Sequence, residues 1–128
     1  MLVYFDSSAL VKRYAPNEPN AALVTRKLTT TNRIYTCSIT PVGVRSAFRN
    51  KERSQEFTPA EVTAGVQDYE AHSRKQYTLI QLTTSMVTIA NQLVLKHKLR
   101  AYDALHIATA TEIVQLSISN LIYTVLLV

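Results

Sequence analysis

Apolar and polar residues alternate along this chain in blocks that predict strands and helices in turn. Residues 2–5 form an apolar run that stops at Asp6, a pattern typical of a buried parallel strand that ends in a turn. The pattern over 7–14 then predicts a short helix, and the pattern over 20–29 predicts a second one. Residues 34–39 alternate and are β-branched or aromatic, so we predict a second strand there.

Two predicted helices begin with almost the same four residues. Thr58–Glu61 supplies a hydroxyl cap, a proline at the first helical position and a glutamate at the third, which is a complete capping box for a helix over 59–76. Thr40–Gly43 begins in the same way and predicts a helix over 41–53 with Thr40 as its cap. Gly43 stands where the other helix has its glutamate, and a glycine in the first turn is less favourable than alanine by roughly 1 kcal/mol.

The second half of the chain continues the alternation. We predict a short strand over 78–82, a helix capped by Thr84 or Ser85 that runs to His97, and a further helix over 101–115. Residues 121–128 are almost wholly apolar and predict a central strand. Strands that alternate with helices indicate an α/β fold in which helices cover both faces of a parallel sheet.

Composition narrows the class of protein. The chain has 128 residues, of which 47% are hydrophobic and 18% charged, so we expect one globular domain over residues 1–128. No apolar stretch approaches the roughly 18 residues that span a bilayer, and no signal peptide is recognisable. Cys37 is the only cysteine, which excludes an intrachain disulfide and fits a reducing cytoplasm. The net charge of +5 is compatible with a polyanionic partner such as nucleic acid.

Two carboxylates stand on otherwise apolar segments. Asp6 ends the first strand and Asp103 opens the helix over 101–115. Asp6 alone reads as a helix cap, and Asp103 alone as a complement to the positive end of a helix. The presence of both acids favours a metal site, because buried carboxylates are costly unless they share a cation or a partner. Acidic oxygens favour Mg²⁺ or Mn²⁺. His106, one turn after Asp103, is expected to be a packed or hydrogen-bonded residue rather than a base or ligand.

Three segments resemble, in order and spacing, the PIN-domain ribonucleases, and most closely the VapC-like toxins of bacterial toxin–antitoxin pairs. They are VYFDSSALVKRY (3–14), SITPVGVRSAFRN (38–50) and LRAYDALHIATA (99–110). The resemblance implies a three-layer α/β/α sandwich with a parallel central sheet. It also implies a cluster of acids that holds Mg²⁺ or Mn²⁺, which activates water to hydrolyse RNA phosphodiester bonds.

The resemblance assigns roles residue by residue. Asp6 matches the first acid of the family and Asp103 the acid of its D-A-L-H-x-A segment, so both are expected to be catalytic metal ligands. Ser7 or Ser8 matches a supporting hydroxyl, a possible extra ligand or water holder. The second acid of the family, a glutamate early in the third helix, is missing because Gly43 occupies its position.

The C-terminal end departs from the family as well. The family's fourth acid follows the last sheet strand, but no acid follows Glu112 in this chain, and the closing helix and strand of the family are missing. We therefore expect a C-terminal end that is shortened or altered, by truncation or by a frameshift. Two carboxylates in place of four predict weak metal binding, poor orientation of water and much reduced hydrolysis.

Partners and rival functions follow from the same comparison. The family implies RNA as substrate, a small antitoxin that inserts into the acidic pocket, and a homodimer, for which the apolar end Ile122–Val128 gives modest independent support. Arg45 and Arg49 lie four residues apart near the entrance that the family uses for RNA, and phosphate contact and surface solvation are equally open readings for them. The alternatives to a weakened ribonuclease are a catalytically degenerate module that binds RNA or a protein, and a product without selected activity.

Overall fold

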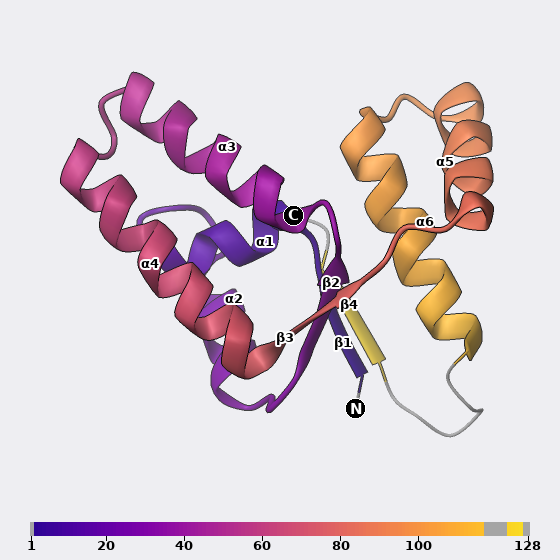
Figure 1. Cartoon of the computed structure of the whole chain (residues 1–128), viewed down its shortest axis with the longest axis horizontal. Coiled ribbons are helices and arrows are strands. Elements are labelled where there is room, and N and C mark those ends of the chain that lie inside the picture. The colour runs from indigo at the N-terminus through magenta and orange to yellow at the C-terminus, as the bar shows by residue number, and fades with distance from the viewer. Residues whose placement is uncertain (1, 117–122, 127–128) are drawn as a thin grey trace.

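The computed structural model describes residues 2–116 and 123–126, and these form an α/β/α sandwich around a parallel sheet (Figure 1). The strands are β1 (Leu2–Phe5), β2 (Ile34–Cys37), β3 (Tyr77–Ile80) and β4 (Tyr123–Leu126), in the spatial order β3-β2-β1-β4. Every pairing is parallel, with Tyr4 opposite Tyr35, Ile34 opposite Tyr77 and Leu2 opposite Tyr123. The three-layer parallel fold expected from the sequence is confirmed.

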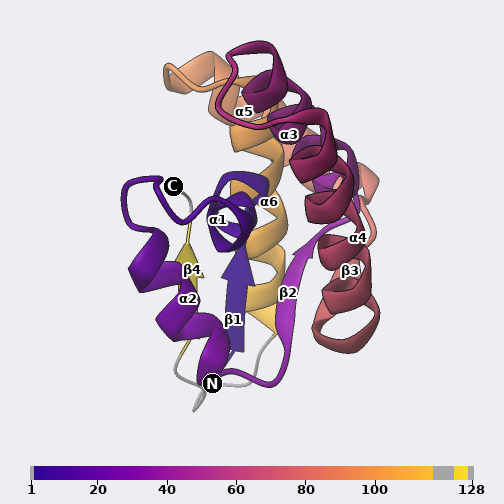
Figure 2. The ribbon, with the colours of Figure 1, turned by 90° about the vertical axis from the view of Figure 1, so that its left-hand side faces the viewer.

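The helices divide between the two faces of the sheet. On one side lie α1 (Ser7–Val11), the 3-10 turn η1 (Lys12–Tyr14), α2 (Ala21–Thr29), α3 (Thr40–Arg53) and α4 (Pro59–Gln76). On the other side α5 (Thr84–Lys96) and α6 (Ala101–Leu116) pack against each other as a pair (Figure 1). Figure 2 shows β1 and β2 pointing toward the same edge of the sheet, where α1 and α3 begin.

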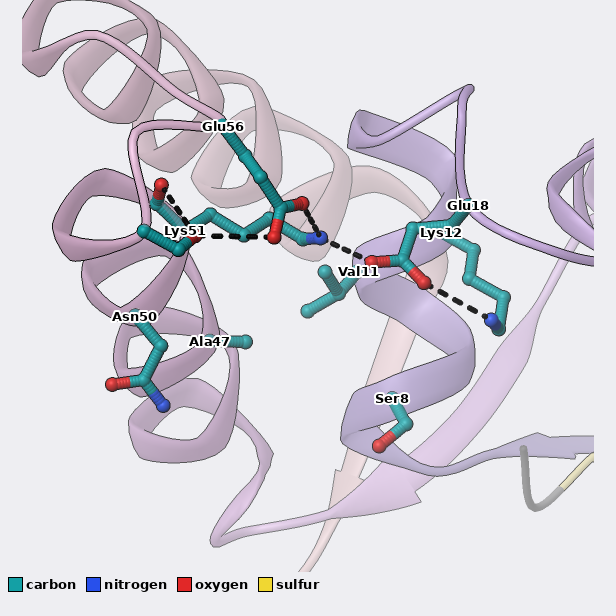
Figure 3. Close-up of a pocket in the computed structure, with 9 residues that line it drawn as sticks. Ser8, Val11, Lys12, Glu18, Ala47, Asn50, Lys51 and Glu56 are labelled. Carbon is teal, nitrogen blue, oxygen red and sulfur yellow. Dashed lines mark hydrogen bonds and ion pairs between the residues drawn. The ribbon is translucent and has the colours of Figure 1, made fainter.

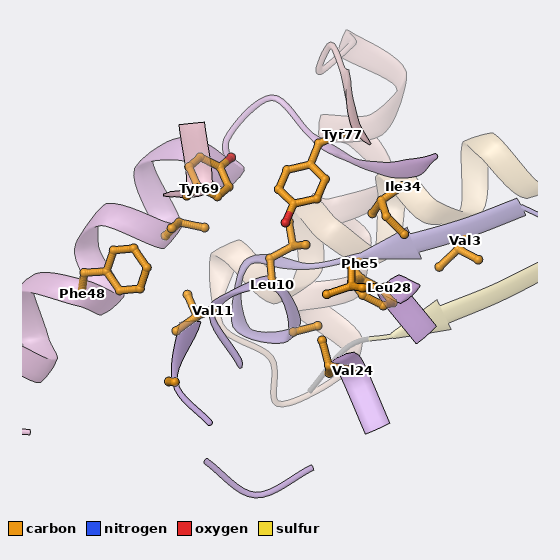
Figure 4. Close-up of a cluster of buried hydrophobic side chains, with 13 residues drawn as sticks. Val3, Phe5, Leu10, Val11, Val24, Leu28, Ile34, Phe48, Tyr69 and Tyr77 are labelled. Atoms are coloured by element: carbon orange, nitrogen blue, oxygen red, sulfur yellow. The ribbon is translucent and has the colours of Figure 1, made fainter. Parts of the chain in front are cut away.

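Strand β1 serves a separate core on each face. Val3 and Phe5 are fully buried among side chains of α1, α2, α3 and α4, in the cluster drawn in Figure 4. Tyr4, between them, is fully buried on the opposite face with Cys37, Ala110 and Ile113. Because successive side chains of a strand point to opposite faces, an apolar run without alternation is what a strand buried on both sides requires.

Local signals for helix starts succeed at one position and fail at two. The capping box of Thr58 and Glu61 is present in full. The prediction that Thr40 caps α3 was wrong: α3 begins at Thr40 itself, and its buried hydroxyl bonds Thr36 Oγ1 at 2.6 Å. The cap of α5 is Thr83, not Thr84 or Ser85, and its hydroxyl accepts the Met86 N–H.

The last predicted strand also differs from expectation. β4 pairs only with β1 and lies at an edge of the described sheet, so the prediction of a central strand was wrong. Its apolar sequence resembled that of a strand with two neighbours, but sequence alone does not report strand order. Residues 121–122 and 127–128, also assigned to this strand, lie outside the described residues.

A buried ammonium group ties the connections around α3 together (Figure 3). The side chain of Lys51, 10% exposed, pairs with Glu18 of the α1–α2 connection and with Glu56 of the α3–α4 turn. Glu18 also pairs with Lys12, at 3.6 Å. Lys51 holds the pKa of Glu18 and Glu56 below their usual range through these hydrogen bonds. The two lysines are therefore already neutralised within the fold.

Removing this charge tests its structural role. We expect Lys51→Met to lower the free energy of unfolding by about 1–2 kcal/mol, because the aliphatic stem is kept while two charge-assisted hydrogen bonds are lost. Arg49→Met is the matched control, since Arg49 pairs with Glu52 on an exposed surface and its loss is expected to cost about 0.5 kcal/mol or less. Urea unfolding of both variants measures the difference, and equal costs would contradict the assignment.

Candidate functional site

Asp6 is held at the point where β1 turns into α1. Its side chain is 4% exposed, and its Oδ1 accepts the N–H of Ala9 at 2.7 Å, so Asp6 is the N-cap of α1. The strand carries the residue to the carboxyl edge of the sheet, where ligands bind in open α/β folds. The capping bond fixes one carboxylate oxygen, so this acid is both a structural cap and a rigid, negatively charged group at the sheet edge.

A pocket of about 340 Å³ brings the predicted site residues together. Asp6, Ser7, Gly43 and Asp103 all line it, although they come from three separate segments. Asp103 lies in the first turn of α6 with its side chain 40% exposed, and its Oδ2 is 3.4 Å from Nε of Arg100. The remaining lining residues are Ser8, Val42, Ser46, Ala47, Asn50, Arg100, Tyr102 and His106.

The position of the missing glutamate is filled by a close helix contact. A Cβ placed on Gly43 would lie 2.4 Å from Ser7 Oγ and 2.8 Å from Ser7 Cβ, both shorter than real contacts allow. Only a residue without a side chain lets α3 approach α1 this closely. The third neighbour of that Cβ is Tyr102 Cε2 at 3.6 Å, an ordinary contact. Ser7 is thus the obstacle to any side chain at position 43.

A hydrogen-bonded chain of three side chains runs behind the pocket. His106 is 2% exposed, with Tyr4 Oη 2.7 Å from its Nδ1 and Ser7 Oγ 3.1 Å from its Nε2. Burial lowers the pKa of His106 to about 4, against a smaller opposing effect of Asp103. Burial also raises the pKa of Tyr4 far above its usual range. Both groups are neutral at pH 7, which agrees with the expectation that His106 is a hydrogen-bonded core residue.

The family of the chain follows from a comparison of its sequence with family models. The model of the PIN domain matches residues 3–120, which include Asp6, Gly43 and Asp103. The chain belongs to the PIN domain family. No curated protein matches it. The family match shows a nuclease-type fold for this chain and agrees with the sandwich described above.

The metal donors of this PIN domain are few. Among residues 2–116 and 123–126, no three His, Cys, Asp or Glu side chains form a group that could hold a metal ion. Asp6 and Asp103 nevertheless line one pocket and offer carboxylate oxygens, the donors that hard divalent cations prefer. Mg²⁺ is commonly bound by one or two carboxylates, with water and substrate phosphate completing its shell. The donor chemistry of Asp6 and Asp103 therefore fits a single hard divalent cation.

Helix α3 carries both pocket residues and the two arginines that are predicted to contact RNA. The positions of α3 that line the pocket are 42, 43, 46, 47 and 50. Arg45 and Arg49 are not among them. Arg45 donates to Glu70 at 2.6 Å and lies 5.9 Å from the ring of Tyr69, whereas Arg49 pairs with Glu52. Their contact with RNA stays a prediction.

Sequence reasoning missed several lining residues of the pocket. Ser46 and Asn50 follow Gly43 at intervals of three and seven, a spacing that would have placed them beside it on the helix. The pocket is also lined by Arg100 and Tyr102, which precede Asp103 by three residues and by one. The next three acids along the chain after Gly43 each have a partner elsewhere: Glu52 pairs with Arg49, Glu56 with Lys51, and Glu61 accepts the Thr58 N–H.

No helix in the described part of the chain is both long and apolar enough to cross a bilayer.

The lowered pKa of His106 predicts a dependence of stability on pH. Its pKa is about 4 in the folded state against an ordinary 6.5, so the unfolded chain binds the extra proton first. The contribution of neutral His106 to the free energy of unfolding is then fully present above pH 6.5. This free energy falls by roughly 3 kcal/mol as the pH drops toward 4. Urea unfolding between pH 4.5 and 7.5 measures the slope. His106→Gln should remove most of it, whereas His72→Gln, at a half-buried site, should remove less.

Proposed function

We propose that this PIN domain is a metal-dependent endoribonuclease of the VapC toxin type with weakened activity. The observation that supports the proposal is the meeting of Asp6 and Asp103 in one pocket at the carboxyl edge of the sheet. Mg²⁺ or Mn²⁺ bound there would supply an activated water and neutralise charge on the phosphodiester. RNA as substrate, a small antitoxin as partner, a homodimer and a cytoplasmic location belong to the same proposal.

The residues of the chain have distinct tasks in this function. Asp6 and Asp103 would hold the cation, and Asp6 does so with one oxygen already fixed by the Ala9 N–H. Arg100 lines the pocket with its side chain 90% exposed, so its guanidinium can pair with a phosphate of the substrate instead of with Asp103. Ser46 and Asn50 supply neutral polar groups on the opposite wall.

A second candidate is favoured by the contact at Gly43. Ser7 fills the space in which the glutamate of a complete site would begin, so the fold has closed over that ligand position. We therefore also consider a degenerate PIN module that binds RNA or a protein partner without cleaving it. The two candidates differ in metal dependence, because phosphate contacts alone give RNA binding that resists chelators and weakens steeply with salt.

Cleavage of an RNA pool by the purified chain tests the first candidate. We expect slow cleavage that needs Mn²⁺ or Mg²⁺, stops with EDTA, and is lost in Asp6→Asn. Asparagine caps a helix as well as aspartate does, so the loss reports on the charge and not on folding. Asp68→Asn, on the exposed face of α4, is the control and should cleave like the native chain. Chelator-resistant RNA binding without cleavage would instead support the degenerate module.

A double variant tests the blocked ligand position. Gly43→Glu alone should lower the free energy of unfolding without a gain in cleavage, because its Cβ collides with Ser7. Ser7→Gly with Gly43→Glu removes both colliding atoms and leaves Tyr102 at 3.6 Å, so we expect tighter Mn²⁺ binding and faster cleavage than in Ser7→Gly alone. The matched control is Ser7→Gly alone. A Gly43→Glu variant as stable as the native chain would show that the contact does not block the position.

A further inference from the structure

Tyr4, Ser7 and His106 bracket the two acids of the pocket. Tyr4 precedes Asp6 by two residues and Ser7 follows it directly, whereas His106 lies one helical turn after Asp103. The hydrogen bonds from His106 therefore join the segment that carries one acid to the helix that carries the other. Tyr4 and His106 are 0% and 2% exposed, and Ser7 is 9% exposed, so water competes little for these bonds.

Burial and the chemistry of the three groups favour one arrangement of their protons. A neutral imidazole has one N–H donor and one acceptor nitrogen. Tyr4 is fully buried and Nδ1 lies 2.7 Å from its hydroxyl, so we take the tautomer in which this hydroxyl donates to Nδ1. The N–H of Nε2 then donates to Ser7 Oγ at 3.1 Å. This arrangement leaves the hydroxyl hydrogen of Ser7 to be donated within the pocket, which Ser7 lines.

The bonds of His106 are the ones nearest Asp103 that tie α6 to the β1–α1 segment, because in the described part of the chain the other side-chain hydrogen bonds of α6 to neighbouring elements come from Thr109 and Glu112, further along the helix. Near Asp103 it packs through the small side chains Ala104 and Ala108, against α5. Its apolar contact with the core around Tyr4 is made by Ala110 and Ile113, about two turns further along. Apolar packing of small residues tolerates sliding and rotation, whereas hydrogen bonds to two fixed partners do not.

We propose that Tyr4, His106 and Ser7 form a positioning relay that holds Asp103 at a fixed place relative to Asp6. His106 is then a positioning residue of the cation site, acting through the helix that carries Asp103 and not as a ligand. The inference rests on the proposed function, because it concerns the same two carboxylates. It adds one requirement to the proposed function: the affinity for the cation depends on the hydroxyl of Tyr4, which is buried behind the pocket.

The chain contains a matched pair of variants for this test. Tyr4→Phe removes the hydroxyl that bonds Nδ1 of His106, and Tyr14→Phe removes the one 3.0 Å from Nδ1 of His72, outside the pocket. Both substitutions delete one oxygen from a tyrosine–histidine contact and keep the ring. We expect Tyr4→Phe to weaken Mn²⁺ binding about 10-fold, the lower end of the loss typical for outer-shell partners, and Tyr14→Phe to leave it unchanged.

Mn²⁺ binding followed by electron paramagnetic resonance separates the outcomes without any activity assay. If the native chain does not bind Mn²⁺, the proposed function fails and the relay with it. If the native chain and Tyr4→Phe bind Mn²⁺ equally, the relay alone is wrong. Nitrogen NMR of the native chain gives a test that needs no variant: His106 should carry its proton on Nε2 and stay neutral at pH 6. A proton on Nδ1, or titration near pH 6.5, would overturn the relay.

Discussion

The burial of Asp6 at the end of β1 is the constraint on which the rest of this structure depends. A carboxylate in a nearly closed position is costly unless hydrogen bonds or a cation compensate it. The Ala9 N–H supplies one such bond and starts α1 in the same step. Because β1 is buried on both faces and paired on both edges, the strand cannot shift to release the acid. The position of the Asp6 carboxylate is therefore fixed both by the sheet and by the start of α1.

Much of the fold could be predicted because its signals are local. The apolar run before Asp6 and the capping box at Thr58 depend on a few neighbouring residues, and both were predicted as they occur. The errors arise where a distant partner decides. Thr40 bonds Thr36 instead of capping α3, and β4 lies at an edge although its sequence suits a centre. Strand order and hydroxyl partners are set by tertiary packing, which no local window contains.

The site divides in the same way. Asp6 and Asp103 could be picked out because each interrupts an apolar segment and matches a family motif, and they do line one pocket. Gly43 was recognised as a missing acid, but the reason a glycine is needed there is a contact with Ser7, 36 positions earlier in the chain. A glutamate introduced at position 43 alone would therefore collide with Ser7.

The basic side chains that remain for binding a substrate can be compared with the two carboxylates of the pocket. The chain carries a net charge of +5, but four of its basic side chains pair with carboxylates of the fold: Lys12, Lys51, Arg45 and Arg49. Of these four, only Lys12 and Lys51 line a cavity beside the pocket. Positive charge within the pocket comes from Arg100, itself beside Asp103. A divalent ion would cancel the charge of the two carboxylates, and water or a phosphate of a substrate would take its remaining coordination positions. In the proposed function, the cation and an RNA phosphate would therefore bind each other as well as the protein, and each would raise the affinity of the pocket for the other.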